Sequence, residues 1–173
     1  VKPMLAALRR WDLRASHRVH RFVAISRHVQ ERIERFYGRE ADVVYPPVDI
    51  HRWTPGARTS HDFDLIVSAL VPYKRIDLAV RAYNRTGYPL RIVGSGSELA
   101  RLQAMAGDNI RFEGRLPDER ILDLYRRCRM LVFPGEEDFG IVPLEAQACG
   151  RPVVAYGRGG ALETVKEGVS GAF

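Results

Sequence analysis

The feature that most constrains the fold is a repeated alternation of short apolar runs and helical stretches after residue 62. Apolar runs predict strands at 63–68, 90–93, 110–112, 130–133 and 152–155. Apolar residues at helical spacing predict helices near 75–86, 98–106, 117–127, 143–149 and 160–166. Strands that alternate with helices in this way favour a parallel sheet covered by helices on both faces. The sequence therefore predicts an α/β fold for this part of the chain.

The first third of the chain is organised differently. Its patterns predict helices and strands at 5–14, 22–25, 26–37 and 42–45. Ser26 is placed to cap the second helix, and Gly38 to end it. Residues 51–61 include Pro55, Gly56, Thr59 and Ser60 and few apolar side chains, which suggests a linker.

We therefore expect two parts. Residues 1–57 would be the end of one domain with its linker, and residues 58–173 would form a second domain. The chain begins Val1-Lys2, without an initiator methionine, so we expect a piece of a longer protein.

The net charge of +6 lies in the first third. Residues 1–60 hold 12 Lys and Arg against 6 Asp and Glu, whereas residues 61–173 hold 15 against 15. Arginines around Trp11 could bind an anionic membrane surface or a nucleic acid. A solvated helix face is the alternative that we favour, because arginine outnumbers lysine 24 to 3 throughout the chain. We expect no nucleic-acid partner, since this charge lies outside the predicted ligand edge of the sheet.

Other residue types exclude several classes of protein. No apolar run reaches the ~18–20 residues that span a bilayer. Cys128 and Cys149 have no metal-ligand spacing and are typical of buried thiols in a reducing cytoplasm. The histidines likewise lack metal-ligand spacing and stand at positions 17, 20, 28, 51 and 61. We expect no metal site.

Two carboxylates eight positions apart carry the main functional signal. Glu137 follows the apolar run 130–133, and Glu145 is expected in the first turn of a helix whose start is marked by Gly140 and Pro143. Such a segment offers carboxylates to hydroxyl groups, and backbone N–H groups with a positive helix end to an anion. A nucleoside diphosphate sugar has both kinds of group. The alternative is an ordinary acidic turn followed by a glutamate that favours the helix dipole.

Further candidates lie where other predicted strands end, at the edge where parallel sheets bind ligands. Lys74 and Arg75 follow the first of these strands and could neutralise a diphosphate. Gly94 and Gly96 follow the second, where they could cradle phosphate or simply form a tight turn. After the third strand come Gly114, Arg115 and Leu116, which could hold a base or be a plain turn.

Five ordered segments resemble the donor-binding half of the group 1 retaining glycosyltransferases, which have the GT-B fold. They are Ser68–Arg75, Val93–Glu98, Glu137–Glu145, Ala148–Ala155 and Gly159–Glu163. Phe22–Ser26 and Tyr45–Asp49 resemble the end of the acceptor-side domain of that family. The segment Ser68-Ala-Leu-Val-Pro-Tyr-Lys-Arg75 is most similar to a mannosyltransferase branch that builds surface polysaccharides. The resemblance implies a Rossmann-like sheet, truncated at its C-terminus, as the C-terminal half of a GT-B enzyme.

The resemblance also implies a role for each site residue. Glu145 would bind the ribose hydroxyls, and Glu137 the hydroxyls of the donor sugar. Lys74 would neutralise the diphosphate. The donor would also contact Asp138, Phe139, Gly140 and Ile141, and its base would lie on Gly114, Arg115 and Leu116. The family does not typically need a bound metal.

One position departs from the family. An arginine usually stands five residues before the lysine, where this chain has Ala69. We expect Arg75 to supply the second cation instead.

The resulting expectation is a cytoplasmic glycosyltransferase, with a possible peripheral contact at the inner membrane face. It would transfer mannose from GDP-mannose to a polysaccharide, glycan or lipid-linked acceptor, without a cofactor. The alternatives are a UDP-sugar donor and a nucleotide-sugar-binding module without catalysis. We expect these 173 residues alone to bind donor weakly and to transfer little, because only ~50 residues of the acceptor-side domain are present.

Overall fold

A computed structural model describes residues 2–56 and 62–173. Residues 57–61 lie outside the described residues. This range includes Thr59, Ser60 and His61 and the domain boundary expected after residue 57. The chain divides into two compact units, Val1–Pro46 and Pro47–Phe173. The division precedes the linker that the sequence suggests, and residues 47–56 belong to the second unit. Each unit is described by itself.

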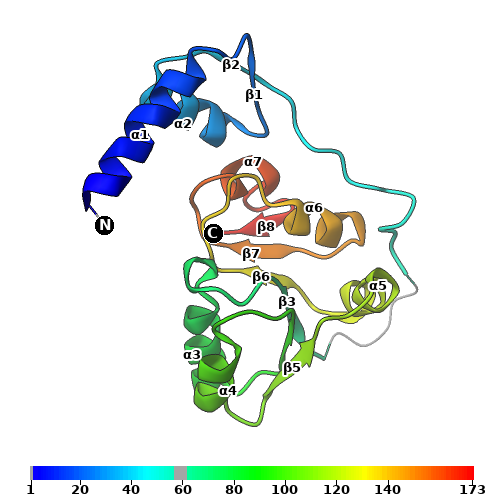
Figure 1. The fold of residues 1–173 in the computed structure, drawn as a ribbon. Coiled ribbons are helices and arrows are strands. Elements are labelled where there is room, and N and C mark those ends of the chain that lie inside the picture. The colour runs from blue at the N-terminus through cyan, green and yellow to red at the C-terminus, as the bar shows by residue number, and fades with distance from the viewer. Residues whose placement is uncertain (1, 57–61) are drawn as a thin grey trace. The chain divides into compact units, whose positions relative to one another are not determined.

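The first unit contains two helices and a two-stranded parallel sheet (Figure 1). Its elements are α1 (Lys2–Ser16), β1 (Phe22–Ala24), α2 (Arg27–Tyr37) and β2 (Ala41–Val43). The Ser26 side chain accepts a hydrogen bond from the backbone N–H of Val29, and Gly38 ends α2 in the left-handed conformation at φ 61°. Both predicted caps of this helix are confirmed.

The second unit contains a six-stranded parallel sheet with the order β5-β4-β3-β6-β7-β8 (Figure 1). The strands are β3 (Asp64–Val67), β4 (Leu90–Val93), β5 (Ile110–Gly114), β6 (Leu131–Phe133), β7 (Val153–Ala155) and β8 (Gly171–Ala172). The first five were predicted, whereas the two-residue β8 was not. The predicted α/β fold with a parallel sheet is confirmed.

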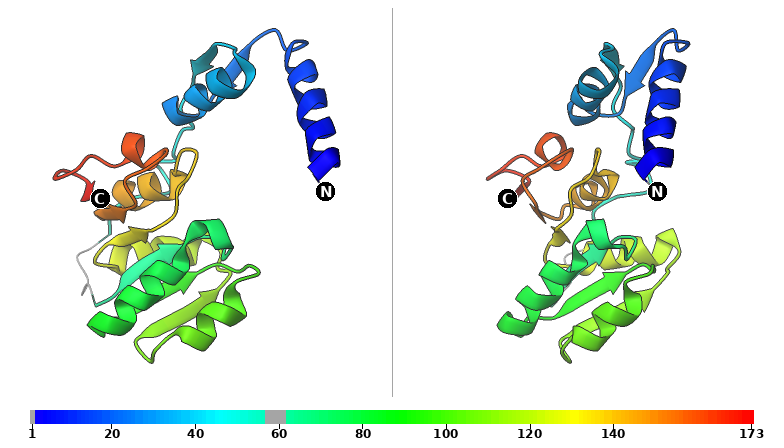
Figure 2. Two further views of the ribbon diagram at one scale, coloured as in Figure 1. Left: turned by 90° about the vertical axis from the view of Figure 1, so that its left-hand side faces the viewer. Right: turned by 60° about the vertical axis from the view of Figure 1, so that its left-hand side comes forward.

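Helices cover both faces of this sheet. They are α3 (Ile76–Thr86), α4 (Leu99–Met105), α5 (Asp118–Arg127), α6 (Ile141–Ala148) and α7 (Ala161–Thr164). One core cluster joins α3 and α4, which lie side by side, to Ile66 and Ile92 (Figure 2). The other joins α5, α6 and α7 to Leu65 and Leu131. Neighbouring residues of one strand thus enter opposite cores, which explains the nearly continuous apolar strands.

One predicted helix start is wrong. The helix expected near residues 75–86 is confirmed, since it begins at Ile76 after a 3-10 turn η1 (Pro72–Lys74) and Arg75 at φ 52°. The helix expected from Pro143 begins at Ile141, because Gly140 forms its N-cap and proline is tolerated in a first turn. Glu145 therefore lies in the second turn of α6, not in the first.

A buried ionic cluster ties together the amino ends of the central strands. Asp64, the first residue of β3, is fully buried and accepts two hydrogen bonds from Arg129, at 2.9 and 2.7 Å. It also accepts one from the Tyr83 hydroxyl at 2.5 Å. The Arg129 guanidinium lies 3.9 Å from the ring centroid of Tyr88, just before β4. The cluster therefore holds the edge of the sheet opposite to the expected ligand edge.

We expect Arg129→Ala to lower the free energy of unfolding by about 2–3 kcal/mol, because it leaves a buried carboxylate with the Tyr83 hydroxyl in place of three donors. Urea unfolding measures the change. The matched control is Arg101→Ala, which removes the ion pair between an exposed arginine and Glu98 and should lower the free energy of unfolding much less. Equal losses in the two variants would contradict this role for the cluster.

Candidate functional site

The strand order of the second unit reverses between β3 and β6. The chain adds β4 and β5 on one side of β3, then crosses over and adds β6, β7 and β8 on the other. At such a reversal the loops after two neighbouring strands turn away from each other, and ligands of doubly wound sheets bind in that crevice. The topology therefore places the candidate site where β3 and β6 end.

Residues from both strand ends line a small cavity at this point. Ser68 and Lys74 come from the segment after β3, and Gly135 and Glu137 from the loop after β6. The candidates Lys74 and Glu137 are 63 positions apart in the sequence, and the sheet brings them together.

Lys74 and Glu137 form an ion pair, Nζ to Oε1, with side chains only 16% and 18% exposed. The ammonium also lies 5.1 Å from the ring centroid of Tyr73. Burial lowers the pKa of Lys74, and the nearby charge of Asp138 partly opposes that shift. A cation and a carboxylate with little access to water thus meet where a ligand would enter.

Gly135 allows this pairing. A Cβ at residue 135 would lie 2.8 Å from both the Cα and the carbonyl oxygen of Lys74. Only glycine lets the loop after β6 pass so close to η1 and carry Glu137 to the lysine. Sequence reasoning did not single out Gly135, although a Pro-Gly pair directly after a strand was a signal for a close backbone approach.

Gly159 and Gly160 fix the other side of the acidic loop. The backbone N–H of Gly160 donates to the carbonyl of Glu137 at 2.7 Å, and residues 137 and 159 form an isolated parallel bridge. A Cβ at Gly160 would lie 2.3 Å from the Cα of Phe139, whose side chain is buried. These glycines, which open the resembling segment Gly159–Glu163, therefore have a packing role.

The loop ends at Gly140, whose left-handed conformation (φ 89°) starts α6. Asp138 is exposed and adjoins the ion pair, and Ile141 is the first residue of α6. The predicted donor-contact segment 138–141 therefore runs from the ion pair to the N-terminus of α6, with the side chain of Phe139 buried, and its contact with the donor stays a prediction.

Glu145 lies one turn further along α6 and is half-buried. The hydroxyl of Tyr125, from α5, donates to its Oε2 at 3.1 Å. Burial raises the pKa of Glu145, and the hydrogen bond from Tyr125 opposes that rise. Sequence reasoning missed Tyr125, because a tyrosine on the apolar side of a helix looks like an ordinary core residue.

Packing accounts for Gly94 and Gly96. A Cβ at Gly94 would lie 1.8 Å from the carbonyl oxygen of Ser68, and one at Gly96 would lie 2.2 Å from that of Leu70. The N–H of Gly94 donates to the carbonyl of Gly114 at 2.7 Å. These glycines bring the loop after β4 against the segment after β3, and their contact with the donor stays a prediction.

The predicted base-binding loop adjoins this segment. Gly114 ends β5 at φ 69°, and the Arg115 side chain donates through Nε to Ser95 Oγ at 2.7 Å. Leu116 packs on the core beneath α5 and α6. The loops after β4 and β5 are therefore joined, and the role of residues 114–116 toward a base stays a prediction.

Arg75 has a partner of its own. Its Nε lies 3.2 Å from Asp77 Oδ1, a carboxylate that also binds Arg81, and half of its side chain is exposed. Only Nε of Arg75 makes this contact, so the terminal nitrogens of the guanidinium could still bind a phosphate. The proposed replacement of the family arginine, absent at Ala69, stays a prediction.

Other sites give no ligand assignment. In the part of the chain that the structure describes, no three His, Cys, Asp or Glu side chains are grouped to hold a metal ion. Cys128 and Cys149 are buried free thiols, as predicted, and burial raises the pKa of Cys128 to about 12. None of the helices within residues 2–56 and 62–173 is long and apolar enough to span a membrane.

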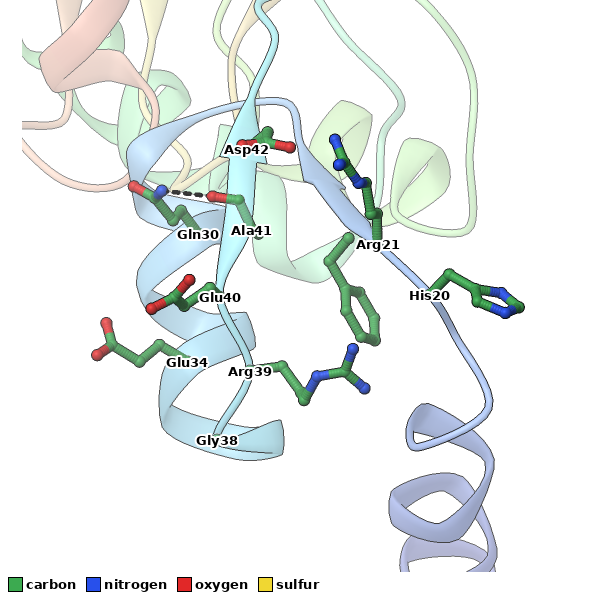
Figure 3. Close-up of a pocket in the computed structure, with 10 residues that line it drawn as sticks. His20, Arg21, Gln30, Glu34, Gly38, Arg39, Glu40, Ala41 and Asp42 are labelled. Carbon is green, nitrogen blue, oxygen red and sulfur yellow. Dashed lines mark hydrogen bonds between the residues drawn. The ribbon is translucent and has the colours of Figure 1, made fainter.

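The first unit has an open pocket of its own, between α2 and the segment before β1 (Figure 3). Its lining mixes Arg21 and Arg39 with Glu34, Glu40 and Asp42. Arg39 already donates to the carbonyls of residues 16 and 19, at 2.9 Å each. This pocket selects neither sign of charge, and it lies outside the sheet whose strand ends carry the candidate residues.

Comparison with known proteins agrees with the geometry. The family model described as "Glycosyl transferases group 1" matches residues 48–173. The D-inositol 3-phosphate glycosyltransferase of Mycolicibacterium smegmatis is 35% identical over 154 residues, which cover 76% of this chain and 36% of that protein. The enzyme of the same name from Acidothermus cellulolyticus is 37% identical over 168 residues, which cover 78% and 38%. The chain therefore spans less than half of the length of these curated relatives.

A solved structure shares the fold. The Anabaena protein HepE, crystallised with UDP and glucose, superposes with a TM-score of 0.85 at 24% identity, over 95% of this chain and 52% of HepE. The parallel sheet with helices on both faces is thus the fold of a GT-B glycosyltransferase half. On the family match and the sequence identity together, this chain belongs to the group 1 glycosyltransferases.

Proposed function

We propose that the second unit binds the donor of a retaining glycosyltransferase, a nucleoside diphosphate hexose. The observation that carries this proposal is the largely buried ion pair of Lys74 and Glu137 at the strand-order reversal. One member can bind a phosphate and the other a sugar hydroxyl. A ligand that carries both groups can replace the contact that each side chain makes with the other.

The chemistry follows from where charge develops. When the bond from the sugar carbon to the diphosphate breaks, negative charge grows on the leaving phosphate oxygens and positive charge on the sugar. Lys74 stabilises the first, and the amino end of α6 adds a favourable dipole. Glu137 orients the sugar through its hydroxyls, and Glu145 binds the ribose. None of these steps calls on a metal ion, so we propose a reaction without one.

Two observations favour different donors. The resemblance of Ser68–Arg75 to a mannosyltransferase branch favours GDP-mannose. HepE, which was crystallised with UDP-glucose as well, favours a uridine nucleotide. The base is recognised by a few hydrogen bonds in the loop 114–116, so that loop decides between them.

The acceptor belongs to the other part of the enzyme. The curated relatives are named for D-inositol 3-phosphate. Residues 1–46 carry 10 Lys and Arg against 5 Asp and Glu, a charge that suits a phosphorylated polyol or a lipid-linked phosphate. We propose an anionic acceptor, and peripheral membrane contact through α1 would bring a lipid-linked one within reach.

We expect the protein to bind one base selectively in calorimetric titrations with UDP, UDP-glucose, GDP and GDP-mannose. Glu145→Ala should weaken that binding about tenfold to a hundredfold, because it removes a charged hydrogen-bond partner of the ribose. Glu119→Ala, an exposed glutamate in the first turn of α5, is the matched control and should change nothing. Absence of binding for all four nucleotides would argue against the donor site.

The pH dependence of binding should report Lys74. Burial lowers the pKa of the Lys74 ammonium, so this side chain loses its proton at a lower pH than an exposed lysine, whose pKa is about 10.4. As the pH rises, the affinity for a nucleoside diphosphate should therefore begin to fall at a lower pH than it would with an exposed lysine. Lys74→Arg keeps the charge at high pH and should remove this alkaline loss. Lys166→Arg, at an exposed lysine, is the control. If affinity still falls at high pH in Lys74→Arg, the loss comes from a group other than Lys74.

A further inference from the structure

The segment at the start of the second unit lies against α5. Asp49 begins a tight turn in which its side chain accepts hydrogen bonds from the N–H groups of His51 and Arg52, at 3.0 and 3.2 Å. Its carbonyl accepts from the N–H of Trp53 at 2.9 Å. Trp53 is 7% exposed and belongs to the core under α5, α6 and α7. The turn thus anchors this segment to the core through Trp53, with Val48 packed beside it.

Two successive residues of α5 hold this segment. Arg126 donates to the carbonyl and the hydroxyl of Thr54, at 2.9 and 2.6 Å. Tyr125 meets Trp53 edge to face, with ring centroids 5.5 Å apart and an interplanar angle of 81°. An aromatic pair in this geometry is favourable beyond the area it buries and fixes the direction of both rings.

The far end of Tyr125 reaches the candidate site. The ring is fully buried, and its hydroxyl donates to Glu145 Oε2. Burial and the neighbouring carboxylate raise the pKa of Tyr125 well above its usual value, so the hydroxyl keeps its proton and donates. A continuous chain of contacts therefore runs from Trp53 through Tyr125 to the carboxylate expected to bind ribose.

We propose that Tyr125 is a positioning residue, which holds Glu145 for the ribose hydroxyls while Trp53 fixes the tyrosine ring. This inference rests on the proposed function, in which Glu145 binds ribose. It gives the segment 47–54 a part in nucleotide affinity, although that segment precedes the first strand of the sheet. The packing of Tyr125 is a separate matter, since a phenylalanine would fill the same space.

Tyr125→Phe separates these two roles, because it keeps the ring against Trp53 and removes only the hydroxyl. The preferred nucleoside diphosphate should bind about tenfold more weakly to this variant. Its 2′,3′-dideoxy analogue, which lacks the ribose hydroxyls, should bind wild type and variant equally. Tyr37→Phe is the matched control, because it also removes a tyrosine–carboxylate hydrogen bond, to Asp12 at 2.8 Å, but in the first unit. It should leave nucleotide affinity unchanged.

A pH profile adds a readout that packing alone would not move. The Tyr125 hydrogen bond lowers the pKa of Glu145, so its loss should raise that pKa. Binding that needs the ionised carboxylate should then fail at a higher pH in Tyr125→Phe than in wild type as the solution is acidified. Trp53→Phe should weaken nucleotide binding to a smaller extent and shift the profile in the same direction.

The outcomes separate the inference from the proposed function. If Glu145→Gln weakens nucleotide binding and Tyr125→Phe does not, the positioning role is overturned and the donor site stands. If Tyr125→Phe weakens the binding of the nucleotide and of its dideoxy analogue equally, the tyrosine only supports the fold and the inference also fails. If Glu145→Gln has no effect on nucleotide binding, Glu145 does not bind the ribose, and the inference that depends on this role fails as well. Non-additive losses in the double variant Tyr125→Phe/Glu145→Gln would support the positioning role.

Discussion

The position of β3 in the sheet is the constraint on which the candidate site depends. This strand is hydrogen-bonded to β4 on one edge and to β6 on the other, so the chain must cross over to continue. The loops after β3 and β6 then leave neighbouring strands in different directions and open a crevice. Lys74 and Glu137 owe their contact to this crossover. The ionic cluster around Asp64 holds the same strands at their opposite ends.

Glycines let the loops at the strand ends approach one another closely. Gly135 lets the loop after β6 touch the backbone of Lys74, and Gly160 lets it touch the turn after β7. Gly94 and Gly96 do the same between the loops after β3 and β4. A loop confined by backbone contacts on two sides has few conformations, so Glu137 reaches its position without help from a long side-chain network. This rigidity suits a site that must hold opposite charges ready for a substrate.

The two carboxylates of the site are held in different ways. Lys74 and Glu137 neutralise each other, which makes their burial tolerable. Glu145 accepts a hydrogen bond from a neutral tyrosine hydroxyl, so its negative charge is not cancelled. Burial disfavours the charged form and raises the pKa of this carboxylate. The first pair suits groups that carry charge or develop it, and the second carboxylate suits neutral hydroxyls. This division matches the diphosphate and ribose of a nucleotide sugar.

The sequence by itself determined the α/β class, five of the six strands of the sheet, the caps of α2 and most of the candidate residues. These follow from local causes: apolar periodicity, capping side chains, and the rule that ligands bind where parallel strands end. Only the tertiary structure decided which candidates meet. In the structure Lys74 pairs with Glu137, and Arg75 contacts Asp77. Gly94 and Gly96 allow close backbone packing, and Tyr125 donates a hydrogen bond to Glu145. Such contacts depend on strand order and on distances between remote segments, which the local pattern of a sequence does not encode.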